Sequence, residues 1–545
     1  MNKMVSPLIL TALILGFHIA KGQQKNEGKQ PLTDTSIQLM PNEFWWGGAI
    51  TYGNKMPLGK ENFSVNLNGD ASQNQAVPLL ISNEGRWLWS NEPFRYSFRN
   101  DSLVIDETHS KILVDKNGSS LREAYQYTSK QFFPPSGKWP DSLLITAPQY
   151  NLWIELMYNP NQQDVLSYAE KVLANNFPAG VLMIDDNWST YYGEFEFNKE
   201  KFPDAKKLMD QLHAKGFKTM LWICPFISPD SEAFRELAAK KLLLLDNEGN
   251  QSLTWDKAKK PLLIEWWNGF SACLDLTNPA AQQWLKTKLG TLQKNYGVDG
   301  FKLDAGDAYF YDDPKLISHK KVSPNEQCEA WANIGLAFPL NEYRAMWKMG
   351  GEPLVQRLAD KDHSWAALQL LIPNTIAQQL AGYTFTCPDM IGGGQFTSFL
   401  PGKMIDQKLI VRSAQVHSLM PMMQFSVAPW RILDSVHFAA VKKSVEIRQQ
   451  YLPQLMPVMR TAVQTGEPAL RPLEYNFPHQ GFIEIKDQFM LGENLMIAPV
   501  VTNGDTRQVV FPKGKWKYKN RIFKGPLKKM FRVSLDELLI FEKVK

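Results

Sequence analysis

The chain has 545 residues, 44% of them hydrophobic and 21% charged, and its formal net charge is only +5. This is the composition of a globular protein whose length exceeds one ordinary domain but suits a large α/β barrel with smaller companion domains. Because the net charge is small and no Lys/Arg-rich run stands out, we expect no nucleic-acid partner.

The N-terminus has the three parts of a secretory signal peptide. A basic start is followed by an apolar run over 6–17, and the small residues Ala20 and Gly22 come next at the spacing of a cleavage site. The run is too short to span a bilayer. We therefore expect residues 1–22 to be removed and the mature protein to be exported, to a periplasm or out of the cell, without a membrane partner.

Three regions of different pattern follow. Over 23–148, short β-type runs separated by Asn, Gly, Pro and Asp predict an N-terminal β-sandwich. Over 149–455, apolar strands alternate with helical periodicity, which predicts a parallel sheet covered by helices. Over 456–545, strands return and predict a small C-terminal β-sandwich. The predicted fold is thus α/β, a (β/α)8 TIM barrel between two β-sandwiches.

Several elements of the predicted barrel can be placed individually. We expect strands at 152–158, 181–184, 218–223, 298–304 and 383–386, helices at 162–176, 204–215, 364–381, 410–420 and 436–451, a small hairpin at 242–254, and a polar insertion at 309–337. Beyond the barrel, the first C-terminal strand is expected at 482–485. Polar or aromatic residues end each barrel strand, which is where a (β/α)8 barrel carries its chemistry.

The run from Val298 to Asp307 carries two charged residues inside an apolar strand. If it is a strand, Lys302 and Asp304 share one face while Phe301 and Leu303 share the other. A lysine beside this aspartate favours its ionised form, which a nucleophile requires. A buried structural ion pair would have the same pattern, so these ten residues alone leave both interpretations open.

The metal-binding residue types are few and scattered. The four cysteines show no Cys-x-x-Cys spacing, and the eight histidines form no His-Glu-x-x-His pattern. We expect Cys224, Cys273, Cys328 and Cys387 to be buried thiols outside disulfides, and we expect no metal or other cofactor.

The strand endings, taken together and in order, resemble glycoside hydrolase family 31 over most of the mature chain. The motifs that carry the resemblance are Asp185-Asp-Asn-Trp188, Trp267-Asn-Gly269, Asp275-Leu-Thr-Asn-Pro279, Asp299-Gly-Phe-Lys-Leu-Asp304, Asn341-Glu-Tyr343, Arg357 with Asp360 and Trp365, Pro388-Asp-Met-Ile-Gly-Gly393, and Arg412 to Pro421.

The resemblance implies a retaining glycosidase that uses two carboxylates. Asp304 matches the nucleophile. For the acid/base, the family pattern places the residue five positions before an aromatic, here Trp365, which selects Asp360 over Asp362. Asp362 is then expected near the start of the following helix. Asp275, Asp299 and Asn341 are expected to be structural.

Family positions also imply a pocket for the sugar that is cleaved off. Carboxylates and arginine would bind the ring hydroxyls, and tryptophans would face the ring, although core packing is the competing interpretation for Trp222 and Trp267. The implied substrate-binding residues are Asp185, Asp186, Trp188, Trp222, Trp267, Lys302, Arg357, Asp389 and Gln424.

One departure from the family's glucose-specific members bears on the sugar. Those members carry an Arg and a His shortly after the proline aligned with Pro421, where this chain has Gln424 and Ser426. The pattern is similar to the branch that contains bacterial α-galactosidases and the animal myogenesis-regulating glycosidase. We therefore expect an α-galactosidase that acts on terminal sugars of oligosaccharides or glycosides. The alternatives are an α-glucosidase, an α-xylosidase, or a barrel that binds sugar without cleaving it.

Overall fold

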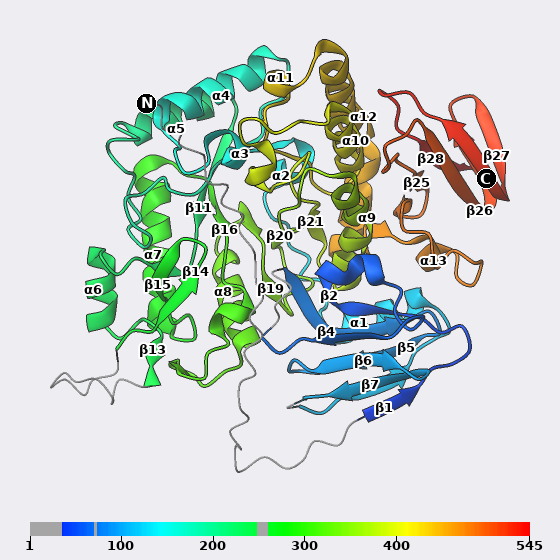
Figure 1. Ribbon diagram of the computed structural model, residues 1–545, viewed down its shortest axis with the longest axis horizontal. Helices are drawn as coiled ribbons and strands as arrows, with labels where there is room; N and C mark the ends of the chain where they lie inside the picture. The colour runs from blue at the N-terminus through cyan, green and yellow to red at the C-terminus, as the bar shows by residue number, and fades with distance from the viewer. Residues whose placement is uncertain (1–34, 70–73, 109, 248–259, 545) are drawn as a thin grey trace, which may run out of the picture.

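The computed structural model describes residues 35–69, 74–108, 110–247 and 260–544 (Figure 1). The predicted signal peptide lies outside these ranges. Within them, no helix is both long and apolar enough to cross a membrane. All four cysteines are buried thiols outside disulfides, as predicted.

The central domain is an eight-stranded sheet in which every neighbouring pair is parallel and the strands follow chain order. This confirms the predicted (β/α)8 barrel. The strands at the two ends of this order also come close together. A hydrogen bond of 2.8 Å shows this, from the N–H of Ile391, just after one end strand, to the carbonyl of Gln424 in the other. The strands are β9 (Gln149–Asn151), β10 (Val181–Ile184), β11 (Lys218–Ile223), β16 (Gly300–Leu303), β18 (Asn341–Tyr343), β20 (Val355–Arg357), β21 (Phe385–Cys387) and β22 (Gln424–Phe425).

Helices surround this sheet, and side chains cap several of their first turns. Asp204 accepts the N–H of Lys207, and Ser364 accepts the N–H of Ala367. The helices are α3 (Trp153–Leu156), α4 (Gln162–Ala174), α5 (Ala205–Ala214), α6 (Glu232–Ala239), α7 (Pro279–Tyr296), α8 (Pro324–Gly335), α9 (Trp365–Leu380), α10 (Gln407–Ser418), α11 (Pro429–Ile432) and α12 (Ser435–Thr465).

The first predicted barrel strand is wrong in position. The strand ends at Asn151, and Trp153–Leu156 form the one-turn helix α3. Asn151 Oδ1 accepts the N–H of Trp153, and Ser426 Oγ accepts the N–H of Ile154, both at 2.9 Å. Because side chains take these two N–H groups, the backbone leaves the sheet ladder.

Two other expectations about elements need correction, and a third falls partly outside the described ranges. The predicted insertion at 309–337 contains the barrel helix α8, which a capping box of Ser323 and Glu326 starts. The predicted strand at 482–485 is irregular. Of the hairpin predicted at 242–254, residues 248–254 lie outside the described ranges. Its described part bonds to the chain beyond the gap, where Asp246 donates to the carbonyl of Lys260 and Leu262 to that of Leu244, both at 2.8 Å. The strand β13 (Leu245–Asp246) also pairs with β17 (Leu316–Ile317).

Three short segments follow barrel strands, and two of them, a hairpin and the 3-10 helix after β21, supply residues to the cavity described below. A hairpin follows β11 and α6, and its turn is Trp267-Asn268. A 3-10 helix follows β16, and another follows β21. These elements are β14 (Leu263–Trp266) and β15 (Gly269–Cys273), which pairs with β12 (Phe226–Ile227), together with η3 (Ala308–Tyr311) and η4 (Phe396–Phe399).

The N-terminal domain has two antiparallel β layers, and it takes the place of a barrel helix. Between β18 and β20, the described segment 344–354 has no helix, and its strand β19 (Met346–Trp347) pairs with β4 instead. One sheet has the order β1 (Thr35–Gln38), β7 (Ser102–Asp106), β6 (Arg95–Arg99) and β3 (Phe63–Asn66). The other has β19, β4 (Gln75–Ser82), β5 (Arg86–Trp89) and β8 (Leu113–Lys116), with β2 (Trp45–Ala49) also on β4.

The N-terminal region also contains helices where only strands and turns are expected. The helix α1 is capped by Ser120, whose side chain accepts the N–H of Glu123, and it packs on β4 and β5. Ser120-Leu-Arg-Glu123 is a readable helix-start signal in the sequence. The helical elements are η1 (Ile50–Lys55), α1 (Leu121–Phe132) and α2 (Leu143–Thr146).

The C-terminal domain is a six-stranded sheet beside the barrel (Figure 1). The helix that leads to it, α12, continues to Thr465 and so crosses the boundary predicted at 455. Prolines 453 and 457 lie inside this helix. The sheet order is β23 (Leu470–Arg471), β24 (Phe489–Leu491), β25 (Leu495–Ile497), β28 (Ile540–Val544), β26 (Thr506–Tyr518) and β27 (Arg521–Arg532), with α13 (Leu473–Asn476) alongside.

Candidate active site

A cavity of about 200 Å³ opens at the carboxyl ends of the barrel strands. Seven of the eleven predicted site residues line it. The full lining is Trp153, Tyr158, Asp185, Asp186, Trp222, Trp267, Lys302, Asp304, Arg344, Asp360, Gln395 and Phe396. This is the end of the barrel where a catalytic site is expected.

Asp304 follows β16 and is held in one orientation. Its Oδ2 accepts the indole N–H of Trp222 at 2.8 Å, and its Oδ1 accepts the backbone N–H of Ala305 at 2.9 Å. The residue is only 7% exposed. The carboxylate is therefore buried, oriented and still in contact with the cavity.

The charges around Asp304 keep it ionised. Burial alone raises the pKa of a carboxyl group, but here the charges of Arg344, Lys302 and Arg357 outweigh burial and hold the pKa of Asp304 well below its usual range. Arg344 Nε lies 3.5 Å from Oδ1, and Lys302 Nζ lies 3.8 Å from Oδ2. An anionic carboxylate at neutral pH is what nucleophilic attack requires.

Arg344 is not among the site residues predicted from the sequence, although it directly follows β18 and so lies at a strand end, where site residues are expected. Its Nη2 donates to Asp307 Oδ2 at 2.5 Å, and its guanidinium lies 4.7 Å from the ring centroid of Trp267. Trp267 is 43% exposed at the turn between β14 and β15. Ion pairing and the cation–π contact therefore fix Arg344 between Asp304 and the cavity wall.

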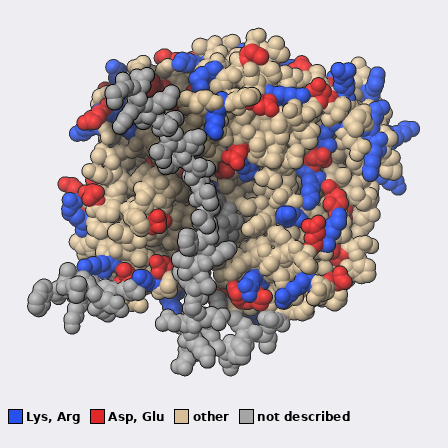
Figure 2. All heavy atoms as spheres, viewed as in Figure 1, with Lys and Arg blue, Asp and Glu red and all other residues tan. Residues whose placement is uncertain are grey.

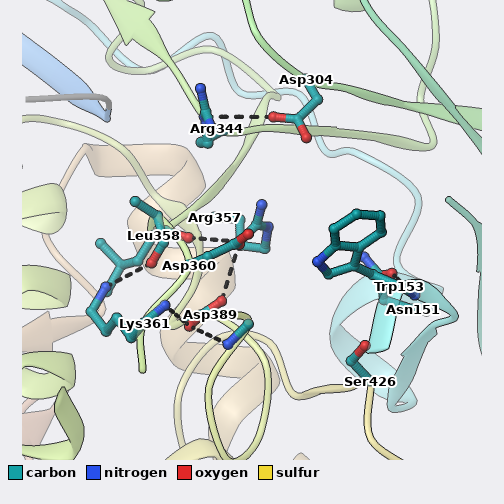
Figure 3. A network of polar contacts seen from close by, with 12 residues as sticks. Asn151, Trp153, Asp304, Arg344, Arg357, Leu358, Asp360, Lys361, Asp389 and Ser426 are labelled. Atoms are coloured by element: carbon teal, nitrogen blue, oxygen red, sulfur yellow. Dashed lines mark hydrogen bonds and ion pairs between the residues drawn. The ribbon is translucent and has the colours of Figure 1, made fainter. Parts of the chain in front are cut away.

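Asp360 lies on the loop after β20, apart from Asp304 in the chain. Arg357 Nη1 donates to Asp360 Oδ1 at 2.6 Å and lies 3.2 Å from Asp389 Oδ1 (Figure 3). The Asp389 carboxylate also accepts the N–H groups of Lys361 and Gly394, at 2.9 and 3.1 Å. Arg357 and Asp389 therefore support Asp360 from beneath.

The support beneath Asp360 is almost completely buried, whereas Asp360 itself reaches the cavity. The side chains of Arg357 and Asp389 are 2% and 1% exposed, against 33% for Asp360. Burial and the charge of Asp360 raise the pKa of Asp389 to about 7. The cluster therefore places a second carboxylate where it can exchange protons with a ligand.

The competing carboxylate, Asp362, does not line this cavity. Its carbonyl accepts the N–H of Ser364, and Ser364 rather than Asp362 caps α9. The geometry therefore favours Asp360 for chemistry in the cavity, and Asp362 precedes the helix without capping it.

Two adjacent carboxylates after β10 form the polar floor. Asp185 Oδ2 accepts from Lys302 Nζ at 2.7 Å. Asp186 accepts from the Tyr192 hydroxyl at 3.0 Å and from Asn268 at 2.9 Å. Burial and the neighbouring charge of Asp185 raise the pKa of Asp186 to about 7. Both side chains offer oxygen atoms to ligand hydroxyl groups.

Aromatic rings form the walls. Trp153 contacts Tyr158 and Phe396 edge to face, with centroids 5.2 and 5.4 Å apart. The sequence analysis did not name these three residues or Gln395. Trp153 and Tyr158 were not identified because the sequence predicts a strand where α3 lies. Gln395 precedes the short helix η4 and Phe396 begins it, in a segment after β21 that carries no periodic pattern.

Four predicted substrate-binding residues do not line the cavity. Trp188 turns away and donates its indole N–H to the carbonyl of Trp222 at 2.7 Å. Gln424 is buried in the barrel, where its Nε2 lies 2.7 Å from both Gln149 Oε1 and Glu342 Oε2. The other two, Arg357 and Asp389, form the support described above.

The residues expected to be structural have structural contacts. Asp299 accepts the N–H of Thr219 at 2.8 Å, and Asp275 accepts the N–H of Thr277 at 3.1 Å. Asn341 accepts the N–H of Val355 at 2.9 Å. Among the residues the structure describes, we find no group of three His, Cys, Asp or Glu placed to hold a metal ion.

Gly394 gives a first test of the site, because the chain packs tightly against both carboxylates there. A Cβ on Gly394 would lie 2.7 Å from Asp389 Oδ1 and 2.8 Å from Asp360 Oδ1. We expect Gly394→Ala to displace Asp360 and to lower kcat/KM by about 10²-fold for the glycosides that the resemblance implies as substrates. Gly290→Ala in α7 is the matched control, since a Cβ there meets nothing within 4 Å. Equal activity of the two variants would contradict the role of this support.

Family models cover most of the chain. Residues 146–457 match the glycosyl hydrolases family 31 TIM-barrel domain, and residues 466–543 match the glycosyl hydrolase family 31 C-terminal domain. The gap between the two matches lies at the end of α12.

Similar proteins include glycosidases of several specificities. The chain is 31% identical over 438 residues to the myogenesis-regulating glycosidase of Mus musculus, covering 78% of this chain and 60% of that protein. It is 26% identical to the alpha-xylosidase XylQ of Lactiplantibacillus pentosus, covering 83% and 60%. This chain therefore spans about three fifths of the length of these two relatives.

Solved structures agree on the fold. The Flavobacterium johnsoniae GH31 dextranase complexed with glucose superposes with a TM-score of 0.81 at 18% identity, covering 94% of this chain and 66% of that one. From the matched barrel and C-terminal domains and the similarity to the mouse glycosidase, we conclude that the chain belongs to glycoside hydrolase family 31.

Proposed function

We propose that this protein is an exported, retaining, exo-acting α-glycosidase whose preferred substrate is a terminal α-galactoside. The observation that carries the proposal is one cavity lined both by a carboxylate held ionised, Asp304, and by a second carboxylate, Asp360, on a separate loop. Retaining glycosidases use such a pair for two different tasks. Export rests on the signal-peptide pattern of residues 1–22.

In the first step, an Asp304 oxygen attacks the anomeric carbon while Asp360 gives its proton to the leaving oxygen. The glycosidic bond breaks and a glycosyl ester on Asp304 forms. In the second step, Asp360 takes a proton from water, the water oxygen attacks the same carbon, and the ester bond breaks. Two inversions leave the product with the configuration of the substrate.

A barrel that only binds sugar is the competing function. Such a protein needs hydroxyl-binding groups like Asp185 and Asp186, but it gains nothing from a buried anion surrounded by three cationic side chains. Those charges favour an anionic Asp304 at neutral pH. This arrangement supports catalysis rather than binding alone.

The residues that depart from the glucose-specific pattern reach the cavity only indirectly. Ser426, one of the two residues that depart from the glucose-specific pattern, accepts the N–H of Ile154 and so fixes α3, which carries Trp153 into the cavity wall. Gln424 is too deep to touch a sugar. We therefore assign the choice between axial and equatorial O4 to Asp185, Asp186 and the Trp153 wall.

Substrate comparison tests this preference. Galactose and glucose differ only in the direction of O4, and a polar pocket matched to one direction leaves buried groups unpaired with the other. We expect kcat/KM for p-nitrophenyl α-galactoside to exceed that for the α-glucoside by about a hundredfold or more. Alpha-glucosidase and alpha-xylosidase relatives support the alternative substrates. A higher rate on the α-glucoside or α-xyloside would move the assignment there without altering the roles of the two aspartates.

A further inference from the structure

The C-terminal hairpin formed by β26 and β27 concentrates positive charge. Residues 506–532 contain ten Lys and Arg and no Asp or Glu, although the net charge of the whole chain is only +5. The rest of the chain is therefore net acidic. This segment does not stand out as a Lys/Arg-rich run in the sequence, because its cations alternate with apolar and aromatic residues.

Strand pairing sorts these residues onto two faces. Lys517 is opposite Ile522, Val510 is opposite Lys528, and Gln508 is opposite Met530. Residues directly opposite each other share a face, and alternate residues along a strand share it too. We call this face the basic hairpin face; its cations and exposed apolar residues are Lys515, Lys517, Ile522, Lys524, Lys528, Met530 and Arg532. Glu542 of β28, opposite Lys517, is an acidic residue at its margin.

The basic hairpin face is exposed, and Figure 2 shows Lys and Arg gathered on the side of the molecule where Figure 1 places β26 and β27. Two apolar side chains stand among its cations, since Ile522 is 59% exposed and Met530 is 57% exposed. Lys524 and Lys528 have no carboxylate partner among the described residues. The face therefore presents positive charge and aliphatic surface together.

Protection of an edge strand does not account for this combination. β27 is the last strand of its sheet, and lysines on an edge do prevent unwanted strand pairing. Exposed isoleucine and methionine at the same edge have the opposite effect, because they promote association. Their presence between the lysines points to a partner that is both anionic and apolar.

The aromatic residues of β27 help to identify the partner. Phe523 and Phe531 point to the opposite face, where Phe523 stacks on Phe511 with centroids 5.3 Å apart and Phe531 lies 5.5 Å from Phe541. Sugar rings and nucleic-acid bases bind aromatic faces, and the basic hairpin face offers none. Apolar side chains between cations instead fit the interface of an anionic bilayer. There the apolar side chains contact the acyl chains, and the cations pair with the anionic headgroups.

From these observations we infer that the basic hairpin face docks the protein peripherally on an anionic phospholipid membrane. This revises the expectation from the sequence that the mature protein has no membrane partner. The inference does not depend on the proposed glycosidase activity, because the cavity residues belong to the barrel and the docking residues to the C-terminal sheet.

Vesicle co-sedimentation of the full mature chain tests the inference. We expect binding to phosphatidylcholine vesicles that contain 30% phosphatidylglycerol, release by 0.5 M NaCl, and no binding to pure phosphatidylcholine. These outcomes follow from attraction to anionic headgroups, in which the binding free energies of the individual cations are roughly additive. Lys524→Glu/Lys528→Glu should weaken binding at least tenfold. Lys320→Glu/Lys321→Glu, which makes the same charge change at exposed lysines before α8, should leave binding unchanged.

A second pair of variants tests the apolar part. Ile522→Ser/Met530→Ser keeps every charge and should weaken vesicle binding severalfold, while circular dichroism confirms an unchanged unfolding temperature. Binding of polygalacturonate without vesicle binding would overturn the inference in favour of an acidic polysaccharide. Equal vesicle binding by wild type and either variant pair, or no binding of wild type, would also overturn it.

Discussion

Asp304→Asn is expected to lower kcat for every glycoside substrate by at least roughly a thousandfold. An amide cannot form the glycosyl ester, so the first chemical step loses its nucleophile. The fold should persist, because asparagine keeps the size of the side chain and its one amide oxygen can still accept one of the two N–H groups that Asp304 accepts, from Trp222 or from Ala305. Steady-state kinetics with a nitrophenyl glycoside and thermal unfolding of both proteins measure the two effects.

Asp362 supplies the control for this prediction. Asp362→Asn makes the same chemical change outside the cavity, and it should retain nearly full activity. Substantial residual turnover by Asp304→Asn, with an unchanged product anomer, would contradict the assignment of the nucleophile.

The second large effect concerns Asp360 and depends on the leaving group. Asp360→Ala removes the proton donor, so natural glycosides with poor leaving groups should react about 10²- to 10⁴-fold more slowly. Dinitrophenyl glycosides need no proton, so they should still form the glycosyl ester, which then persists because no base activates water. Added azide should restore turnover and give a glycosyl azide of retained configuration.

Asp362→Ala provides the matched measurement. If Asp360 is the acid/base, Asp362→Ala shows neither the dependence on leaving group nor the response to azide. If instead Asp362→Ala responds to azide and Asp360→Ala does not, the acid/base lies two residues further along the chain than we propose.

The charged strand that organises the site was predictable from the sequence alone. Alternation along a strand places Lys302 and Asp304 on one face, and the structure has them 3.8 Å apart beside the cavity. The resemblance to glycoside hydrolase family 31 implied Asp185, Asp186 and Asp360 as site residues, and the structure places all three at the same cavity. The shared face of Lys302 and Asp304, by contrast, follows from strand periodicity, which is a local rule.

Side-chain direction beyond a strand end was not predictable in the same way. Trp188 belongs to a motif at a strand end, yet its indole binds the carbonyl of Trp222 instead of facing the cavity. Similarly, the turn into α3 depends on Ser426, which lies far along the chain from Ile154. Such contacts are set by tertiary packing, and no local pattern encodes them.

Some features that were not predicted do have local signals in the sequence. Arg344 directly follows a barrel strand, and the same rule that selected Asp304 would have selected it. The N-cap residue Ser120 and the capping box of Ser323 mark the starts of α1 and α8, in regions where the sequence analysis predicts strands and an insertion. Giving these helix-start residues more weight than the composition of the two regions would have predicted both helices.

Trapping the covalent intermediate tests the central claim most directly. An activated fluorinated glycosyl fluoride of the preferred sugar slows the second step more than the first, so a glycosyl ester accumulates. Mass spectrometry of the intact protein should show one added sugar, and peptide mapping should place it on Asp304, with no label on the Asp304→Asn variant. A label on another residue, or fluoride release that yields the inverted sugar without any adduct, would contradict the account.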